Sequence, residues 1–236
     1  MGEGIGTDEL IMPYISSANI ACGGHAGDES IIQKTIRLAK KYEVSIGAHP
    51  SFPDRKNFGR IEMNLSESEI YQEVYQQVQL IRKIATEEGI QLLHVKPHGA
   101  LYNSAAKNES VSNVIVQAIA DIDPTLRVYG LPLSIFEKVS LKNGLQFIGE
   151  GFADRTYTDD GSLTPRTSAD AMITDKAISI EQVINMALRQ EVKTTSGKWI
   201  NMPVKTICIH GDGEHAVTFA KSIHDALNQK NIIIKY

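Results

Sequence analysis

Short apolar runs alternate with amphipathic segments along most of the chain. The apolar runs predict strands at Ser17–Gly23, Val44–Ala48, Leu92–Lys96, Arg127–Leu131, Gln146–Glu150 and Thr206–His210. The segments between them predict helices at Glu29–Tyr42, from a capping box at Ser66 to about Glu88, and near Ser110–Ile122, Ser134–Asn143, Ile180–Glu191 and Glu214–Gln229. Strands that alternate with helices are typical of βαβ units and a parallel sheet.

The polar residues inside the predicted strands share one face. His94, Lys96 and His98 alternate with Leu93 and Val95, so the two sets point to opposite sides of the sheet. The same alternation occurs in Asn19–His25, Val44–His49 and Thr206–Asp212. An open doubly wound sheet is the alternative fold, but its strands should be almost continuously aliphatic. One aliphatic and one small or polar face instead favours an α/β barrel.

Two stretches interrupt the alternation of predicted strands and helices, and neither has the composition of a linker. Asp154–Asp170 is a long loop rich in Thr, Asp and Ser, and Thr194–Trp199 has the pattern of a hairpin tip. The tail Asn231–Lys235 is apolar and strand-like. Because 236 residues suit one α/β barrel, we expect a single domain over residues 1–236.

Composition narrows the class of protein. The net charge of −4 and the lack of a basic run argue against nucleic acid or a membrane surface as a partner. No apolar stretch approaches the roughly 18 residues of a membrane span, and no signal peptide is visible. Cys22 and Cys208 lie in strand-like contexts that predict buried thiols. We expect a cytoplasmic enzyme with a small-molecule substrate.

Ionisable side chains gather where the predicted strands end, which is the catalytic edge of α/β barrels. They are His25, His49, Lys96, His98, Glu150, Asp154, Arg155, His210 and Asp212. One histidine after a strand is more often structural, and Asp212 alone could cap a helix. Charges on an inward face are nevertheless costly to bury without a partner. Their occurrence at five strand ends favours a functional site.

The residue types suggest binding roles. Two histidines such as His25 and His49 can hold a divalent metal ion together with an aspartate. Lys96, with Arg155 or Arg166, can hold a carboxylate or a phosphate. The sequence therefore predicts a site for a small anion, with a metal ion as an open possibility.

The chemistry is narrowed by the motifs that the chain lacks. Glu150 or Asp212 can act as a general base. The sequence has no Walker motif, no Gly-rich dinucleotide fingerprint and no Gly-x-Ser-x-Gly, and its two cysteines do not have metal-type spacing. Hydrolysis by activated water, or phosphoryl transfer, is therefore favoured over a serine or cysteine nucleophile.

Five segments resemble the signature segments of the LamB/YcsF family. They are PYISSANIACGGHAGD, IGAHPSFPDRKNFGR, HVKPHGALYN, GFADRTYTDDGSLTPR and ICIHGD, which together extend from Pro13 to Asp212. The resemblance implies a distorted (β/α)7 TIM-like barrel of the glycoside hydrolase/deacetylase type. It also implies a part in the ATP-dependent opening of 5-oxoproline to L-glutamate, as the A subunit of 5-oxoprolinase acting with the B and C subunits.

The family motifs place ten residues in one shared site, and we assign their roles as hypotheses. Lys96, Glu150, His98 and Asp212 are the catalytic candidates. Arg155, Arg166, Asp154 and His210 are the candidates for binding substrate or phosphate. His25 and His49 are the candidates for a divalent cation such as Mg²⁺, although Mg²⁺ prefers oxygen ligands. ATP is the expected cosubstrate.

The resemblance has one departure. Family members normally begin with a strand reading Asp-Leu-Asn-Cys-Asp before the Gly-Glu that is here Gly2-Glu3, so we expect this chain to lack the first barrel strand. The acidic residues of that strand would lie beside His25 and His49. Two other readings stay open, a metal-dependent deacetylase-like hydrolase that needs no ATP, and a non-catalytic regulatory subunit.

Overall fold

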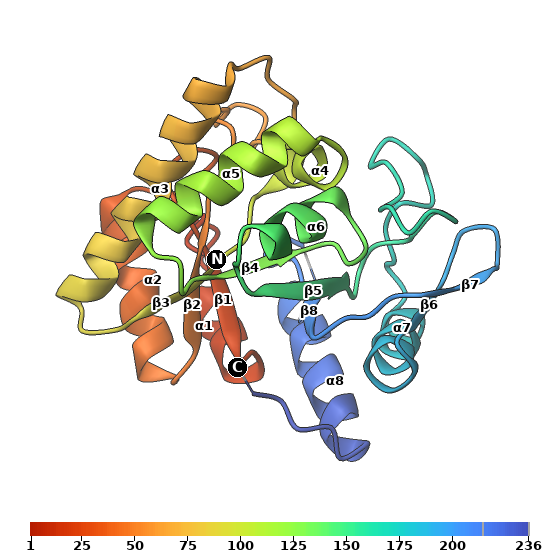
Figure 1. Cartoon of the computed structure of the whole chain (residues 1–236). Coiled ribbons are helices and arrows are strands. Elements are labelled where there is room, and N and C mark those ends of the chain that lie inside the picture. The colour runs from red at the N-terminus through yellow and green to blue at the C-terminus, as the bar shows by residue number, and fades with distance from the viewer. Residues whose placement is uncertain (214, 236) are drawn as a thin grey trace. The chain divides into compact units, whose positions relative to one another are not determined.

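The computed structural model describes residues 1–213 and 215–235, and all six predicted strands are present (Figure 1). They are β1 (Ser17–Ala21), β2 (Ser45–His49), β3 (Leu92–Val95), β4 (Arg127–Gly130), β5 (Phe147–Phe152) and β8 (Thr206–Cys208). Their order in the sheet is β1-β2-β3-β4-β5-β8. The pairings β1–β2, β2–β3, β3–β4 and β5–β8 are all parallel. The predicted α/β class is thus confirmed.

The described chain folds into two compact units. The first comprises residues 1–130 and 134–147, and the second comprises residues 131–133 and 148–235. The first unit holds β1 to β4 and most of the helices. These are α1 (Asp8–Ile11), the 3-10 helix η1 (Met12–Tyr14), α2 (Glu29–Lys41), α3 (Glu67–Glu87), α4 (Gly99–Lys107), α5 (Glu109–Ile122) and α6 (Ile135–Lys142).

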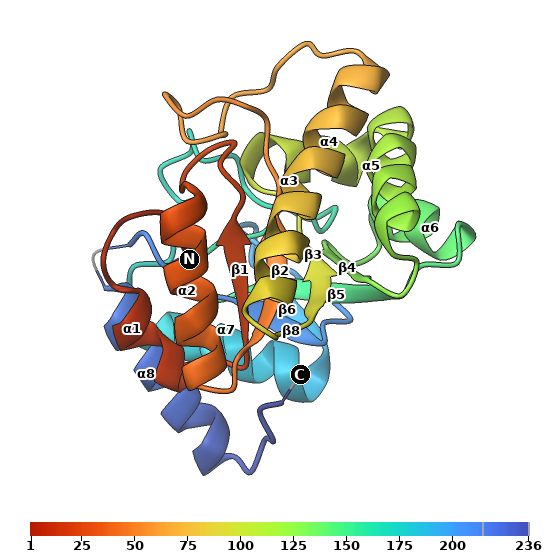
Figure 2. The same cartoon turned by 90° about the vertical axis from the view of Figure 1, so that its left-hand side faces the viewer.

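Helices cover the aliphatic face of β1 to β4. Helix α2 packs on β1 and α3 packs on β2 and β3, and Figure 2 shows α2 and α3 in front of these strands. Side-chain caps start both helices, and the one at Ser66 was predicted. Asp28 accepts a hydrogen bond from the Ile31 N–H, and Ser66 and Glu69 form a reciprocal capping box. Burial of the apolar side chains between helices and sheet is the main stabilisation of this layer.

The opposite face of the first unit is polar, as the alternation predicted. The His94 ring on β3 lies directly over Gly47 of β2, where a Cβ atom would overlap it. His94 Nε2 is 2.9 Å from Asn19 Oδ1 on β1, and the His94 ring stacks on Tyr129 of β4 at 4.0 Å. One inward residue from each of four strands therefore meets in a single layer, with His94 as a structural residue at its centre.

The second unit holds β5, β8 and two helices, α7 (Lys176–Arg189) and α8 (Ala216–Gln229). The predicted hairpin tip is confirmed, because β6 (Glu191–Lys193) and β7 (Trp199–Asn201) pair in antiparallel fashion around it. Helix α7 begins earlier than expected because Asp175 accepts hydrogen bonds from the Ala177 and Ile178 N–H groups. The expected start of the last helix at Glu214 lies outside the described residues.

Two details of the prediction need correction. Helix α4 was not expected, because Gly99, with φ of +57°, looks like a breaker although it only begins the helix. The apolar tail 231–235 forms no strand among the described residues. The edge of β1 is also partly covered, since the Met1 nitrogen donates to Asn19 O and Met1 O accepts from the Ala21 N–H. No helix of the described chain is both long and apolar enough to cross a membrane.

Candidate functional site

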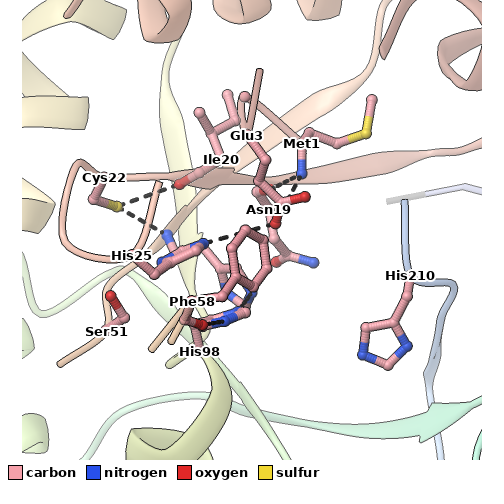
Figure 3. Close-up of polar contacts among 12 residues, drawn as sticks. Met1, Glu3, Asn19, Ile20, Cys22, His25, Ser51, Phe58, His98 and His210 are labelled. Atoms are coloured by element: carbon pink, nitrogen blue, oxygen red, sulfur yellow. Dashed lines mark hydrogen bonds and ion pairs between the residues drawn. The ribbon is translucent and has the colours of Figure 1, made fainter. Parts of the chain in front are cut away.

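Four residues of the first unit form what we call the histidine cluster: Glu3, His25, His49 and His98. His25 follows β1, His49 ends β2, and His98 follows β3 and precedes α4. All three rings are buried. Figure 3 shows Glu3, His25 and His98 grouped beside β1, with the Phe58 ring against them. The carboxyl ends of three neighbouring strands thus bring the three predicted histidines together.

Glycine allows this close packing. Gly59 has φ of +62°, and a Cβ atom there would lie 3.0 Å from His25 Cβ and 3.1 Å from His98 Cδ2. A side chain at this position would therefore be strained and would press on two of the rings. The carbonyl oxygen of Gly59 also accepts a hydrogen bond from the Ala100 N–H at the start of α4.

Backbone carbonyl groups fix the orientation of two rings. His49 Nδ1 lies 2.6 Å from Lys96 O, and His98 Nε2 lies 2.9 Å from Phe58 O. A carbonyl oxygen can only accept, so each of these ring nitrogens carries the hydrogen. The remaining nitrogens, His49 Nε2 and His98 Nδ1, face each other at 3.0 Å.

His25 differs from the other two rings. Neither of its ring nitrogens hydrogen-bonds to any residue that the structure describes, although both are buried. Its ring stacks on His98 with 3.8 Å between centroids, and its Nε2 is 3.7 Å from Glu3 Oε1. A buried polar group without a partner is unusual and asks for an explanation.

Burial keeps the rings neutral. It lowers the pKa of His98 to about 2, with nearby His25 adding to the effect, and it lowers the pKa of His25 and of His49. Burial alone would raise the pKa of Glu3, but the Met1 ammonium group and His25 outweigh it and bring the pKa to about 2. At neutral pH the cluster therefore presents neutral imidazoles beside a carboxylate.

Lys96 is buried next to this cluster, as its inward position predicted. Its Nζ lies over the Tyr102 ring at 5.9 Å from the centroid, and its backbone carbonyl accepts from His49 Nδ1. Lys96 is therefore a buried cation at the edge of the sheet where the three histidines gather.

The second unit holds another pair of functional side chains, Asp154 after β5 and His210 after β8. His210 Nδ1 lies 2.8 and 2.9 Å from the two carboxylate oxygens of Asp154. His210 Nε2 lies 3.3 Å from Nη2 of Arg166. A guanidinium group can only donate, so Nε2 carries the lone pair and Nδ1 the hydrogen. The pKa of Asp154 is lowered because the contact with His210 and the charge of Arg166 outweigh its burial.

A folded loop holds this pair in place. Arg155 is buried, and its Nε and Nη2 donate to Ala171 O and Thr164 O. Gln182 Nε2 of α7 donates to Phe152 O and Arg155 O. The guanidinium of Arg155, expected to bind substrate, thus uses two of its nitrogens to fold residues 155–171. Burial, with Arg166 nearby, lowers the pKa of Arg155 to about 10.

The predicted residues therefore fall into two groups. His25, His49, Lys96 and His98 meet in the first unit, and Asp154, Arg155, Arg166 and His210 meet in the second. Glu150 is buried on β5 and Asp212 is exposed after β8. Sequence reasoning missed Glu3 as a site residue; its only signal was the Gly-Glu pair of the family pattern.

The donor set does not fit the expected Mg²⁺. This ion requires near-octahedral oxygen ligands, whereas the ligand atoms that come within 4.8 Å of one another belong to Glu3, His25 and His98. Only one of these three residues supplies oxygen. His49, the second predicted ligand, presents Nε2 to His98.

Comparison with known proteins agrees with these motifs. The sequence model of the LamB/YcsF family matches residues 1–236. The chain belongs to the LamB/YcsF family. A relative from Tolumonas auensis, described as the A subunit of 5-oxoprolinase, is 46% identical over 231 residues, which cover 98% of this chain and 92% of the relative. The LamB/YcsF fold is also seen in the crystal structure of a lactam utilization protein from Thermus thermophilus. That chain has a TM-score of 0.93 and 37% identity, with 98% of this chain and 93% of that chain covered.

Proposed function

We propose that this protein is the A subunit of a 5-oxoprolinase, which hydrolyses the lactam ring of 5-oxoproline to L-glutamate with ATP and partner B and C subunits. The Asp154–His210 pair is the observation that carries the chemical part of the proposal, because it presents a basic ring nitrogen. The names of the Tolumonas and Thermus relatives support the lactam as the substrate class.

His210 is the general base in this proposal, in place of Glu150 or Asp212. Asp154 holds the hydrogen on Nδ1, so that Nε2 carries the lone pair. That lone pair faces Arg166, and it would take a proton from water once the guanidinium turns to an anionic group of the substrate. The water oxygen then bonds to the lactam carbonyl carbon, and the carbon–nitrogen bond breaks. The protonated His210 returns its proton to the departing nitrogen, so the net change to the lactam is the addition of one water molecule.

A lactam is stabilised by resonance and resists attack by water. Transfer of a phosphoryl group from ATP to the lactam oxygen would release ADP and weaken that resonance. Water addition and cleavage of the carbon–nitrogen bond would then leave an acyl phosphate. A second water molecule would release inorganic phosphate and L-glutamate, so that two water molecules are used for each ATP. Arg166, beside His210 in the second unit, is the cation that we assign to the substrate carboxylate or the phosphate. The buried ammonium of Lys96 is the anion-binding candidate of the first unit. A partner subunit is proposed to contribute to ATP binding, since the chain has no recognised nucleotide motif.

A glutamate-release assay tests the proposal. The chain should be assayed alone and with the B and C subunits, each with and without ATP. We expect release only from the combined subunits with ATP. No release in any combination would contradict the proposal and favour a regulatory role for the chain.

A second candidate is a metal-dependent hydrolase that needs no ATP. The nitrogen-rich histidine cluster favours it, because such sites hold catalytic zinc in other hydrolases. Turnover of 5-oxoproline or of an acetylated substrate by the chain alone, with added Zn²⁺ and no ATP, would support this candidate.

A further inference from the structure

The facing nitrogens of His49 and His98 need a cation between or beside them. Both rings direct their N–H groups to carbonyl oxygens, Lys96 O and Phe58 O. The other nitrogens, 3.0 Å apart, then present two lone pairs to each other. Two acceptors at this distance repel unless a proton or a metal ion binds them.

The hydrogen bonds from His49 Nδ1 and His98 Nε2 to backbone carbonyls match those of metal-bound histidines. A metal-ligating ring usually donates its second N–H to a carbonyl or carboxylate, which fixes both tautomer and orientation. Two nitrogens that bind one ion at about 2.1 Å and at the tetrahedral angle are about 3.4 Å apart. His49 Nε2 and His98 Nδ1 are 3.0 Å apart, so the two rings would separate by a few tenths of an ångström around a tetrahedral ion.

His25 and Glu3 favour an ion over a shared proton. A proton between His49 and His98 would satisfy those two rings and leave His25 unexplained. His25 is 2% exposed, and both its ring nitrogens lack a hydrogen bond among the described residues. Ligand atoms of His25, Glu3 and His98 also lie within 4.8 Å of one another. A third imidazole and a carboxylate beside the facing pair complete a coordination set.

We propose that His49 and His98, together with His25 and Glu3, form a binding site for a divalent transition-metal ion of the Zn²⁺ type. Three imidazoles and one carboxylate suit such ions and not Mg²⁺. The His25 ring lies parallel to His98, so it must turn toward the ion on binding, and it has no hydrogen bond to lose among the described residues. A bound ion with an open position would polarise a carbonyl or phosphoryl oxygen.

Zn²⁺ titration of the metal-stripped protein tests the site without any assay of activity. We expect one equivalent of Zn²⁺ to bind, with a Kd that excess Mg²⁺ does not change. The variants His98→Asn, His25→Asn and Glu3→Gln should each bind Zn²⁺ at least tenfold more weakly. His224→Asn, on the exposed side of α8, is the matched control and should bind as wild type.

A variant could lose Zn²⁺ binding because it is misfolded. Co²⁺ binding to the wild-type chain tests the site without any variant. Bound Co²⁺ should give visible absorption bands of a site with nitrogen ligands, and Zn²⁺ should displace them. Failure of both Zn²⁺ and Co²⁺ to bind the wild-type protein would overturn the proposal, and a far-downfield imidazole proton in the NMR spectrum would then assign the pair a shared proton. Zn²⁺ binding that is unchanged in His98→Asn and His25→Asn would overturn it equally.

Discussion

The two groups of candidate residues use histidine in opposite ways. In the histidine cluster the rings are buried, their N–H groups are fixed by backbone carbonyls, and a carboxylate lies at 3.7 Å from the nearest ring nitrogen. In the Asp154–His210 pair the ring is partly exposed, and a carboxylate binds its Nδ1 directly. The first arrangement suits a stationary cation, and the second suits a proton that is taken up and released.

The difference shows that the group that accepts a histidine's N–H indicates the role of that histidine better than its place on the sheet. All four rings follow or end parallel strands, so their position in the chain is alike. A carbonyl partner cannot stabilise an imidazolium as a carboxylate does. Variants that change these partners can therefore separate the two roles.

Asp154→Asn should have the largest effect on turnover. The amide can donate to Nδ1, which would move the hydrogen to Nε2 and remove the basic lone pair. We expect kcat for glutamate release by the assembled enzyme to fall by about 10²–10⁴, with little change in KM. Asp159→Asn, on an exposed turn of the same loop, is the control. A kcat close to wild type for Asp154→Asn would remove His210 from the role of base.

Lys96→Met tests the buried cation beside the histidine cluster. The methionine keeps an aliphatic stem that can still pack, but it cannot bind an anion. We expect at least a tenfold loss of kcat/KM in the assembled enzyme, about 1.4 kcal/mol of transition-state stabilisation. Lys107→Met, near the end of α4, is the control. A smaller loss with normal folding would argue against substrate binding by Lys96.

Gly47→Ala should affect stability more than chemistry. The added Cβ would overlap the His94 ring, which is held by Asn19 and Tyr129. Overpacking of this kind typically costs about 1–3 kcal/mol, measured as a loss in the free energy of unfolding by denaturant titration. Gly213→Ala, where no atom lies within 4 Å of the new Cβ, should change it little. Equal stability of the two variants would contradict the packing of the polar layer.

The pH dependence of stability gives the smallest predicted effect. Burial, with Lys96 nearby, lowers the pKa of His94 to about 3 from 6.5. Between these values the unfolded chain binds a proton that the folded chain does not, so stability is complete above pH 6.5 and falls as the pH decreases. His94→Phe should reduce this slope by up to about 1.4 kcal/mol per pH unit. Denaturant titrations at pH 5, 6 and 7 measure the slope, and an unchanged slope would contradict a buried neutral His94.

Much of the fold could be predicted from the sequence because the alternation of polar and apolar residues along a strand depends only on neighbouring positions. The shared face of Asn19, His94 and Gly47 follows from spacing alone and is confirmed. Helix α4 escaped prediction because the conformation of Gly99 depends on its packing against Gly59.

The candidate site was less predictable, because function depends on which atoms of a side chain meet. The sequence placed Asp154 and Arg155 together as ligand-binding residues. Only the folded loop distinguishes a carboxylate that orients His210 from a guanidinium that binds the backbone. The inclusion of Glu3 depends on the path of the first residues beside β1, which no local pattern of the sequence indicates.

Turnover of the assembled enzyme with His210→Asn in this chain shows whether this subunit supplies the base for lactam hydrolysis. We expect at least a hundredfold loss of ATP-dependent glutamate release, with the subunits still assembled and with one equivalent of Zn²⁺ still bound to the histidine cluster. Glutamate release at the wild-type rate would contradict this role of the subunit and would move the chemistry to a partner subunit.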